Sequence, residues 1–304
     1  MTRYGRIIAA VGLLASAAPA WAEEPLRVVA TLSSFADLAS TVGGEHVEVG
    51  TVVSPRFNPH FIEPKPSDVR RVKRTVLFIH AGLDLEAWRG PLLDAAGNRR
   101  VFPGGEGELD LSRGMTLLEI PDRPLTRAEG DIHLYGNPHY WLDPENARTM
   151  AEAICDKLCA LDPAHESAYH ANLKAFLDRL EAKLPEWRAR LAPFKGQELV
   201  GYHREWPYLV RFSGLVVEQY LEPKPGIPPT PRQLESLERY MRERGVRVIA
   251  QATYSPTQAA ESLAKRTGAA VVILCQSVRE LPQCGDYIAM MDYNVAQLAG
   301  ALEQ

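Results

Sequence analysis

Apolar residues in the middle of the chain recur every three or four positions, a spacing that places them on one face of an α-helix. They predict one continuous helix that begins at Asp162-Pro163 and runs to about Leu191. At 1.5 Å per residue this helix would span roughly 40 Å, which is longer than a single compact lobe needs. We therefore expect a rigid strut that joins two lobes, with an ordinary surface helix as the alternative. The apolar positions are Tyr169, Leu173, Phe176, Leu177, Leu180, Leu184, Trp187 and Leu191.

On both sides of this helix, short runs rich in β-branched residues alternate with amphipathic stretches. A repeated order of strand and helix indicates a parallel sheet with helices on its faces. The predicted fold class is therefore α/β, with two lobes that are each a small, mostly parallel sheet flanked by helices. We place the N-terminal lobe at residues 23–161, the linking helix at 162–192 and the C-terminal lobe at 193–304.

The individual elements follow from the same periodicities. Residues 97–136 carry several Gly and Pro and are expected to be irregular. Thr230 and Pro231 suit the N-cap and the first position of a helix. The predicted strands are 26–31, 46–53, 75–79, 198–202, 215–221, 246–250 and 269–274, and the predicted helices are 35–42, 66–73, 85–95, 144–161, 205–212, 230–244, 256–267 and 287–302.

Residues 1–22 have the three parts of a secretory signal peptide. Arg3 and Arg6 precede an apolar run, and a small-residue triplet ends at Ala22. The run is shorter than the roughly 20 apolar residues that a membrane-spanning helix needs. No cysteine follows it that would carry a lipid anchor. We therefore expect cleavage after Ala22 and a soluble protein in the periplasm.

The expected mature chain is acidic. Without Arg3 and Arg6 it has 32 basic and 38 acidic residues, a net charge near −6 with neutral histidines. Such a charge is a poor match for nucleic acid, and no Gly-x-x-x-x-Gly-Lys loop is present to hold nucleotide phosphates. Its 282 residues exceed one typical domain of about 150 residues and suit two lobes. We expect a monomer that binds neither nucleic acid nor nucleotide.

Four cysteines would enter an oxidising compartment, where a pair close in sequence can form a disulfide. We expect that pair to be Cys275 and Cys284. Cys155 and Cys159 lie four apart in a predicted helix, where the Cβ atoms are about 6 Å apart and beyond disulfide reach. A four-cysteine zinc site is the alternative, but the gap between the two pairs matches no recognised ligand spacing.

Three of the eight histidines, His60, His139 and His203, fall in predicted loops. His60 and His203 follow predicted strands, and ligands of open α/β sheets bind beyond the carboxyl ends of strands. His60 and His139 each close an Asn-Pro-His triplet, in which proline fixes a backbone dihedral and so helps to hold the imidazole. For each histidine taken alone, the alternative is an ordinary solvated side chain. The repeated triplet makes that alternative less favoured.

Several segments resemble the substrate-binding proteins of zinc and manganese ABC importers, in the same order across nearly the whole expected mature chain. The resemblance implies that His60, His139 and His203 are metal ligands, with the metal in the cleft between two lobes joined by one long helix. It also implies two partners, the membrane permease of an importer and its separate ATPase. The segments are Asn58-Pro59-His60 with Pro64 and Pro66, residues 136–144 with the sequence Gly-Asn-Pro-His-Tyr-Trp-Leu-Asp-Pro, Gly201-Tyr202-His203 with Trp206 and Tyr208, residues 226–231 with Leu234, and the closing residues 285–294.

The chain departs from this family at the fourth ligand. A carboxylate usually follows the last strand of the family's second lobe, whereas the corresponding residue here is Gln276, whose neutral amide is a poor zinc ligand. Water, Asp286 or Glu205 could take that position instead. His133 could assist metal capture or lie at the surface, and His80 could hydrogen-bond to a ligand from behind.

The remaining histidines, His46, His165 and His170, are expected to be solvated. Imidazole donors suit zinc, copper and nickel, whereas manganese prefers carboxylates and water. Copper and nickel bind nitrogen sites at least as tightly, so we expect zinc as the transported ion on its availability, with manganese less favoured. Proton competition for the imidazoles predicts a loss of affinity as the pH falls through about 6.5.

A zinc hydrolase is the rival function, because three histidines and an open position also hold catalytic zinc. Glu205 is the one general base that lies near a predicted ligand in the sequence. Neither a His-Glu-x-x-His nor a Gly-x-Ser-x-Gly motif is present. We therefore expect a carrier and not an enzyme, and a metal-stabilised adhesin would share the same sequence features.

Overall fold

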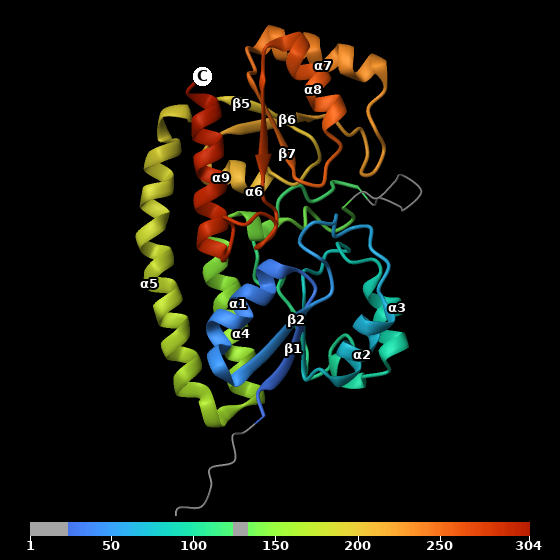
Figure 1. The fold of residues 1–304 in the computed structure, drawn as a ribbon, viewed down its shortest axis with the longest axis vertical. Helices are drawn as coiled ribbons and strands as arrows, with labels where there is room; N and C mark the ends of the chain where they lie inside the picture. Colours follow the sequence, from blue (N-terminus) through green and yellow to red (C-terminus); the bar gives the residue numbers. More distant parts are fainter. Residues whose placement is uncertain (1–23, 124–132) are drawn as a thin grey trace, which may run out of the picture.

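The computed structural model describes residues 24–123 and 133–304, so the expected signal peptide lies outside the described residues. Two four-stranded sheets form the framework, and every strand pairing within them is parallel. The first sheet has the order β2-β1-β3-β4 and lies in the lower half of Figure 1. Its elements and the helices between them are β1 (Leu26–Ala30), α1 (Ser33–Gly43), β2 (Val47–Thr51), α2 (Pro66–Arg74), β3 (Leu77–His80), α3 (Arg89–Ala96) and β4 (Glu108–Asp110).

The second sheet repeats this arrangement, with the order β6-β5-β7-β8, in the upper half of Figure 1. All residues of the inner strands β3 and β7 are buried, as expected for parallel strands with helices on both faces. The predicted α/β fold with two lobes is therefore confirmed. The second set of elements is β5 (Glu198–Gly201), α6 (Pro207–Ser213), β6 (Val216–Tyr220), α7 (Pro231–Arg244), β7 (Val248–Ala252), α8 (Thr257–Thr267), β8 (Ala270–Leu274) and α9 (Tyr287–Leu302).

Two helices connect the sheets, α4 (Asn146–Leu161) and the long helix α5 (Glu166–Leu191). With 26 residues, α5 is about 39 Å long and runs beside both lobes (Figure 1). It contacts α1 and α4 at the first lobe and α6 and α9 at the second. The predicted strut is confirmed, and its buried residues come from the apolar stripe: Tyr169, Phe176, Leu180, Trp187 and Leu191.

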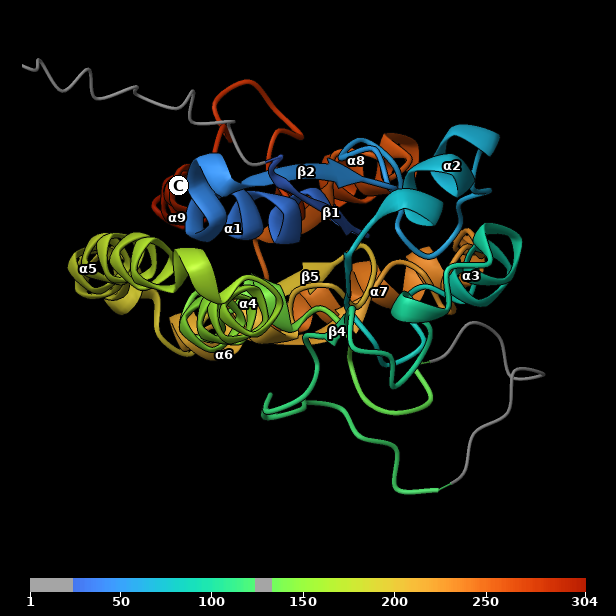
Figure 2. The ribbon, with the colours of Figure 1, turned by 90° about the horizontal axis from the view of Figure 1, so that it is seen from below.

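The lobes share much of their hydrophobic core. One continuous cluster of buried side chains contains residues of both sheets, together with α4, α5 and α9. Figure 2 shows α5 at the outer edge of the molecule with α4 and α9 beside it. Helix α9 packs against α5 and β8 and also contacts α1, so it ties the second lobe to the first. Polar contacts follow the same route, since the Tyr287 hydroxyl donates to the Trp141 carbonyl at 2.6 Å and the Trp141 indole donates to the Gln276 carbonyl at 2.8 Å.

Two predictions about local structure were wrong. The segment 97–136 is not wholly irregular, because β4 pairs with β3 within it. A strand of three residues, Glu-Leu-Asp, is too short to show a periodicity. The helix expected from residue 85 begins instead at Arg89. Residues 83–88 form turns, which start with positive φ angles of 53° at Leu83 and 62° at Asp84.

Candidate metal site

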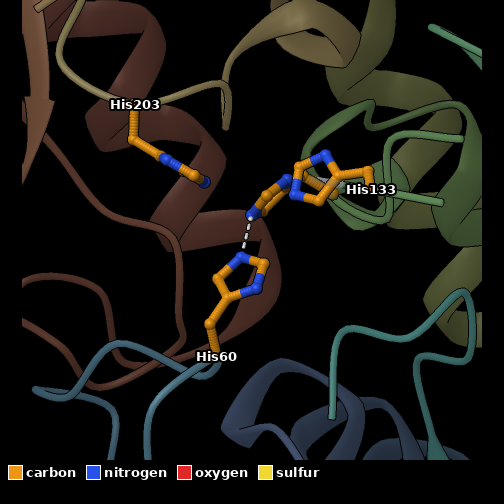
Figure 3. Close-up of side chains that lie close together, drawn as sticks. His60, His133 and His203 are labelled. Atoms are coloured by element: carbon orange, nitrogen blue, oxygen red, sulfur yellow. Dashed lines mark hydrogen bonds between the residues drawn. The ribbon is translucent and has the colours of Figure 1, made fainter. Parts of the chain in front are cut away.

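Four histidines meet between the two lobes. His60, His133, His139 and His203 each direct one ring nitrogen into a common space, and these nitrogens all lie within 4.8 Å of one another. The Nε2 atoms of His60 and His139 are 3.4 Å apart. Figure 3 shows His60, His133 and His203 pointing toward one another from separate segments of the chain. The structure therefore brings together the three histidines singled out in the sequence and adds His133.

Local hydrogen bonds hold the two Asn-Pro-His triplets in the same way. The side-chain oxygen of Asn58 accepts the His60 N–H at 3.0 Å, and that of Asn137 accepts the His139 N–H at 3.0 Å. An Asn oxygen that bonds two residues ahead closes a turn in the manner of an Asx-turn. This turn explains why both triplets present a histidine at a defined angle, beyond the dihedral that proline fixes.

The far ring nitrogen of two histidines is also held. Nδ1 of His139 lies 2.9 Å from the Asn137 side-chain oxygen, and Nδ1 of His203 lies 2.9 Å from a Glu222 carboxylate oxygen. Since both partners are acceptors, each ring carries its proton on Nδ1 and its lone pair on Nε2. A carboxylate or amide oxygen behind a metal-binding imidazole orients the ring and increases its basicity.

Burial keeps the imidazoles of this site in the neutral form that binds a metal ion. His60, His139 and His203 are buried and His133 is half-buried. Burial, reinforced by the neighbouring imidazoles, holds the pKa of His60 and of His139 well below the usual 6.5. Burial lowers the pKa of His133 to about 3. These rings are therefore neutral near pH 7, and their lone pairs are available to a metal ion.

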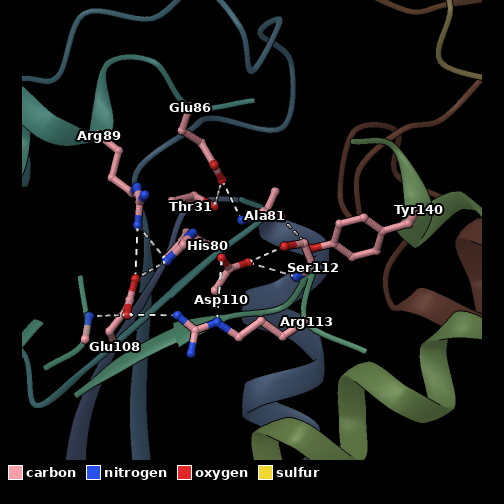
Figure 4. A network of polar contacts seen from close by, with 11 residues as sticks. Thr31, His80, Ala81, Glu86, Arg89, Glu108, Asp110, Ser112, Arg113 and Tyr140 are labelled. Carbon is pink, nitrogen blue, oxygen red and sulfur yellow. Dashed lines mark hydrogen bonds and ion pairs between the residues drawn. The ribbon is translucent and has the colours of Figure 1, made fainter. Parts of the chain in front are cut away.

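Other candidates from the sequence lie in different surroundings. Asp286 caps α9, where its carboxylate accepts the Ala289 N–H at 2.7 Å and pairs with Arg179 at 3.0 Å. Nε2 of His80 lies 3.0 Å from Glu108 and 2.7 Å from Arg89, in a polar network of the first lobe (Figure 4). Neither residue is a member of the group of four histidines.

Glu205 and Gln276 are two buried polar side chains of the second lobe. Burial raises the pKa of the Glu205 carboxyl to about 7, although the nearby His203 imidazole opposes the shift. The side-chain amide of Gln276 has no hydrogen bond of good geometry among the described residues. Glu205 is thus a carboxyl group poised between its neutral and charged forms, and Gln276 remains a neutral amide.

The sequence left His133 open between metal capture and a surface role, and the structure places it in the group of four. One further residue of the site, Glu222, was not predicted from the sequence. Glu222 follows β6 and meets His203 because β5 and β6 are paired neighbours. The sequence feature that could have indicated Glu222 is a carboxylate just beyond the end of a strand that neighbours the one before His203.

The four cysteines do not gather at one point. Cys275 and Cys284 are buried thiols with their sulfur atoms 3.1 Å apart, so the expected disulfide stays a prediction. Cys155 and Cys159 lie together elsewhere, on α4, with 4.0 Å between their sulfur atoms. The alternative of a four-cysteine zinc site therefore has no counterpart among the described residues.

Among the described residues, no helix has both the length and the apolar character needed to cross a bilayer.

The sequence profile of a family described as "Zinc-uptake complex component A periplasmic" matches residues 28–301. The chain is 25% identical to the metal ABC transporter substrate-binding lipoprotein ScbA of Streptococcus cristatus, over 98% of this chain and 97% of that protein. It is 27% identical to the iron-binding protein YfeA of Yersinia pestis, over 86% of this chain and 82% of the relative.

Solved structures give the same answer. A zinc-bound deletion mutant of ZnuA superposes with a TM-score of 0.77 and 26% identity, over 91% of this chain and 98% of that one. The profile match spans nearly all of the described residues, and both the relatives and the superposition extend over both lobes. This chain therefore belongs to the family of the periplasmic component A of zinc-uptake complexes, the metal-binding components of ABC importers.

Proposed function

We propose that this chain captures one divalent transition-metal ion, zinc in preference to manganese, and delivers it to an ABC importer. The observation that carries the proposal is the convergence of four imidazole nitrogens within 4.8 Å of one another. A tetrahedral zinc ion with Zn–N bonds of about 2.0–2.1 Å separates its ligand atoms by roughly 3.4 Å. His60 and His139 already have their Nε2 atoms 3.4 Å apart, so small shifts of the other two rings would complete the shell.

The ligands in this proposal are His60, His139 and His203, with His133 in the fourth position. Nε2 of His133 is buried and has no hydrogen-bond partner among the described residues, which leaves it available to the ion. Gln276 offers only a neutral amide. Asp286 is already engaged as the cap of α9.

The chemistry of the donors supports zinc. Four neutral nitrogen donors suit zinc, whereas manganese prefers carboxylates and water. Of the two carboxyl groups near His203, Glu222 is engaged with Nδ1 behind the ring, and burial disfavours the charged form of Glu205. The names of the relatives refer variously to zinc, manganese, iron or metals in general, so the preference for zinc rests on the donors of this chain.

The hydrophobic core that the two lobes share bears on how the metal ion would be released. The lobes, placed at residues 23–161 and 193–304 on either side of the linking helix, are joined by α5, α9 and a continuous hydrophobic cluster. Such a connection favours a small movement of one lobe over a wide rotation when the metal leaves. The partners would be the importer's permease and its separate ATPase, which a monomer of this protein would meet in the periplasm after its signal peptide is removed.

A competition titration tests the proposal. The purified protein is titrated with zinc, manganese and iron(II) against a chelator of known affinity, beside the variant His139→Ala. We expect a tight zinc equivalent that the variant lacks, weaker manganese binding at the same site, and no turnover of esters or peptides. Metal-dependent turnover that His139→Ala abolishes would instead establish the rival hydrolase, and equal affinity for manganese would contradict the assignment of zinc.

A further inference from the structure

A second group of metal-type donors lies away from the four histidines, between α4 and the beginning of α5. Cys155 and Cys159 are on α4, and His170 is on α5. The Cys155 sulfur is 3.6 Å from Nδ1 of His170, and the Cys159 sulfur is 3.9 Å from Nε2 of the same ring. The expectation that His170 is merely solvated is therefore incomplete, because its ring lies across both thiols.

Helix geometry keeps these two thiols close without letting them join. Residues four apart on a helix have Cβ atoms about 6 Å apart, whereas a disulfide needs about 3.5–4.5 Å. The sulfur atoms of Cys155 and Cys159 are 4.0 Å apart, which is well beyond a covalent S–S bond of about 2.05 Å. The pair can thus persist as thiols in an oxidising compartment.

The same separations suit a bridging metal ion. With Zn–S bonds of about 2.3 Å and a Zn–N bond of about 2.0–2.1 Å, a tetrahedral ion sets its sulfur atoms roughly 3.8 Å apart and sulfur and nitrogen roughly 3.6 Å apart. The observed values are 4.0 Å between the sulfur atoms and 3.6 Å between the Cys155 sulfur and the nearer nitrogen of His170. One donor atom from each of the three residues lies within 4.8 Å of the other two, so modest shifts would bring them to a zinc-binding geometry.

We propose that Cys155, Cys159 and His170 form a second, thiolate-containing site for Zn²⁺ or a similarly thiophilic ion. With Nδ1 of His170 on the ion, Glu166, whose carboxylate is 3.7 Å from Nε2, would lie behind the ring, and water would take the fourth position. Binding would release both thiol protons to solvent and form two metal–sulfur bonds. The ion can enter from outside, because Cys155 is buried, Cys159 is half-buried and His170 is exposed.

An ion at this site would cross-link α4 to the first turns of the long helix. Because α4 and α5 are joined only by a short turn that includes Asp162, the link would pin the end of α5 that packs on the first lobe. The site would then stabilise the fold instead of carrying the transported ion. Its occupancy should be independent of His60 and His139, which lie in the separate group between the lobes.

Cobalt(II) distinguishes the two sites, because cobalt bound to thiolate gives a sulfur-to-metal charge-transfer band in the near ultraviolet that an all-histidine site lacks. The full-length mature protein is reduced and titrated anaerobically with Co²⁺ while absorbance is recorded. We expect a second equivalent that carries this band, its loss in Cys159→Ser and in His170→Ala, and its retention in His60→Ala. His170 is exposed and Cys159 is half-buried, so these variants should fold, and circular dichroism checks that they do.

Matched controls exclude the other thiols. The double variant Cys275→Ser, Cys284→Ser should keep the band, because it removes only the second pair of thiols and leaves Cys155 and Cys159 in place. The proposal is overturned if no thiolate band forms, or if the band survives in Cys159→Ser and disappears in the double variant. Mass spectrometry that finds Cys155 and Cys159 oxidised in protein taken from the periplasm would also overturn it.

Discussion

The two lobes have the same strand order and the same parallel pairing, yet they contribute unequally to the candidate metal site. The first lobe and its loops supply His60, His133 and His139, whereas the second supplies His203 alone. Because the two sheets have the same topology, their loops lie at the same edge of each sheet. The topology does not decide which of these loops carry metal-binding side chains. From this inequality we expect the first lobe to hold an ion by itself and His203 to complete the shell from the other side.

The largest effect is expected at His139, at the centre of the first-lobe group. Its side chain is fully buried, and its Nε2 is 3.4 Å from that of His60. Replacement of a residue behind a metal ligand typically costs 10–100-fold in affinity, so loss of a ligand should cost more than about 100-fold. We expect His139→Ala to lower zinc affinity by at least that factor in a chelator competition. The variant His46→Ala, outside the site, serves as control and should bind as the natural chain does.

A smaller loss is expected for His203→Ala, because three donors on one lobe remain in place. We predict a decrease in zinc affinity of the order of 100-fold or less, given the range cited for residues behind a ligand. Competition titration of both histidine variants under one condition gives the comparison directly. If His203→Ala costs more than His139→Ala, the first lobe does not hold the ion by itself and the proposed inequality is wrong.

The next effect concerns Glu222, which holds His203 through Nδ1 at 2.9 Å. Glu222→Gln keeps the size of the side chain and removes its charge, so the ring should lose basicity and part of its orientation. We predict roughly a 10-fold loss in zinc affinity, at the lower end of the usual range for such groups. Glu218→Gln is a suitable control, because Glu218 lies on β6, the strand that Glu222 follows, and is exposed. Equal losses in the two variants would show that Glu222 acts only through general charge.

The dependence on pH should be weak in the range where histidine ordinarily titrates. Burial lowers the pKa of His133 to about 3 and holds those of His60 and His139 well below 6.5. At these three imidazoles, protons therefore compete with the metal at lower pH than the window near 6.5 expected from the sequence. We predict nearly constant zinc affinity from pH 7 to about 5, measured by titration calorimetry. A tenfold loss of affinity for each unit below pH 6.5 would contradict the lowered pKa values.

The smallest effect on metal binding is expected at Glu205. Burial raises the pKa of this carboxyl to about 7, so its charged form destabilises the folded state, and stability falls as the pH rises from the unfolded value of 4.5 through about 7. Glu205→Gln should leave zinc affinity within a few-fold and raise the free energy of unfolding above pH 7. Urea denaturation at pH 6 and pH 8 measures the second effect. A large loss of zinc affinity would make Glu205 a ligand.

The predictable parts of this protein are those that a local pattern specifies. The stripe from Tyr169 to Leu191 predicted α5, because one buried face repeats over many turns. The two Asn-Pro-His triplets singled out His60 and His139, because the geometry of the triplet is held by its own asparagine. Thr230 was confirmed as the N-cap of α7, where its hydroxyl accepts the Gln233 N–H at 3.3 Å.

The parts that were missed depend on contacts between distant segments. His133 was left open between metal capture and a surface role, and only the folded chain brings it to His60 and His139. Glu222 reaches His203 through the pairing of neighbouring strands. His170 was expected to be solvated, whereas the thiols of α4 lie beside its ring. Single-sequence spacing carries no information on such pairs.

X-ray absorption at the zinc edge, on the Cys159→Ser variant loaded with one equivalent of zinc so that the proposed thiolate site does not contribute, tests the central claim most directly. We predict a first shell of four imidazole nitrogens at about 2.0–2.1 Å and no sulfur, reduced to three imidazoles in His203→Ala. A first shell that contains sulfur, or one that His203→Ala leaves unchanged, would contradict a site built by both lobes.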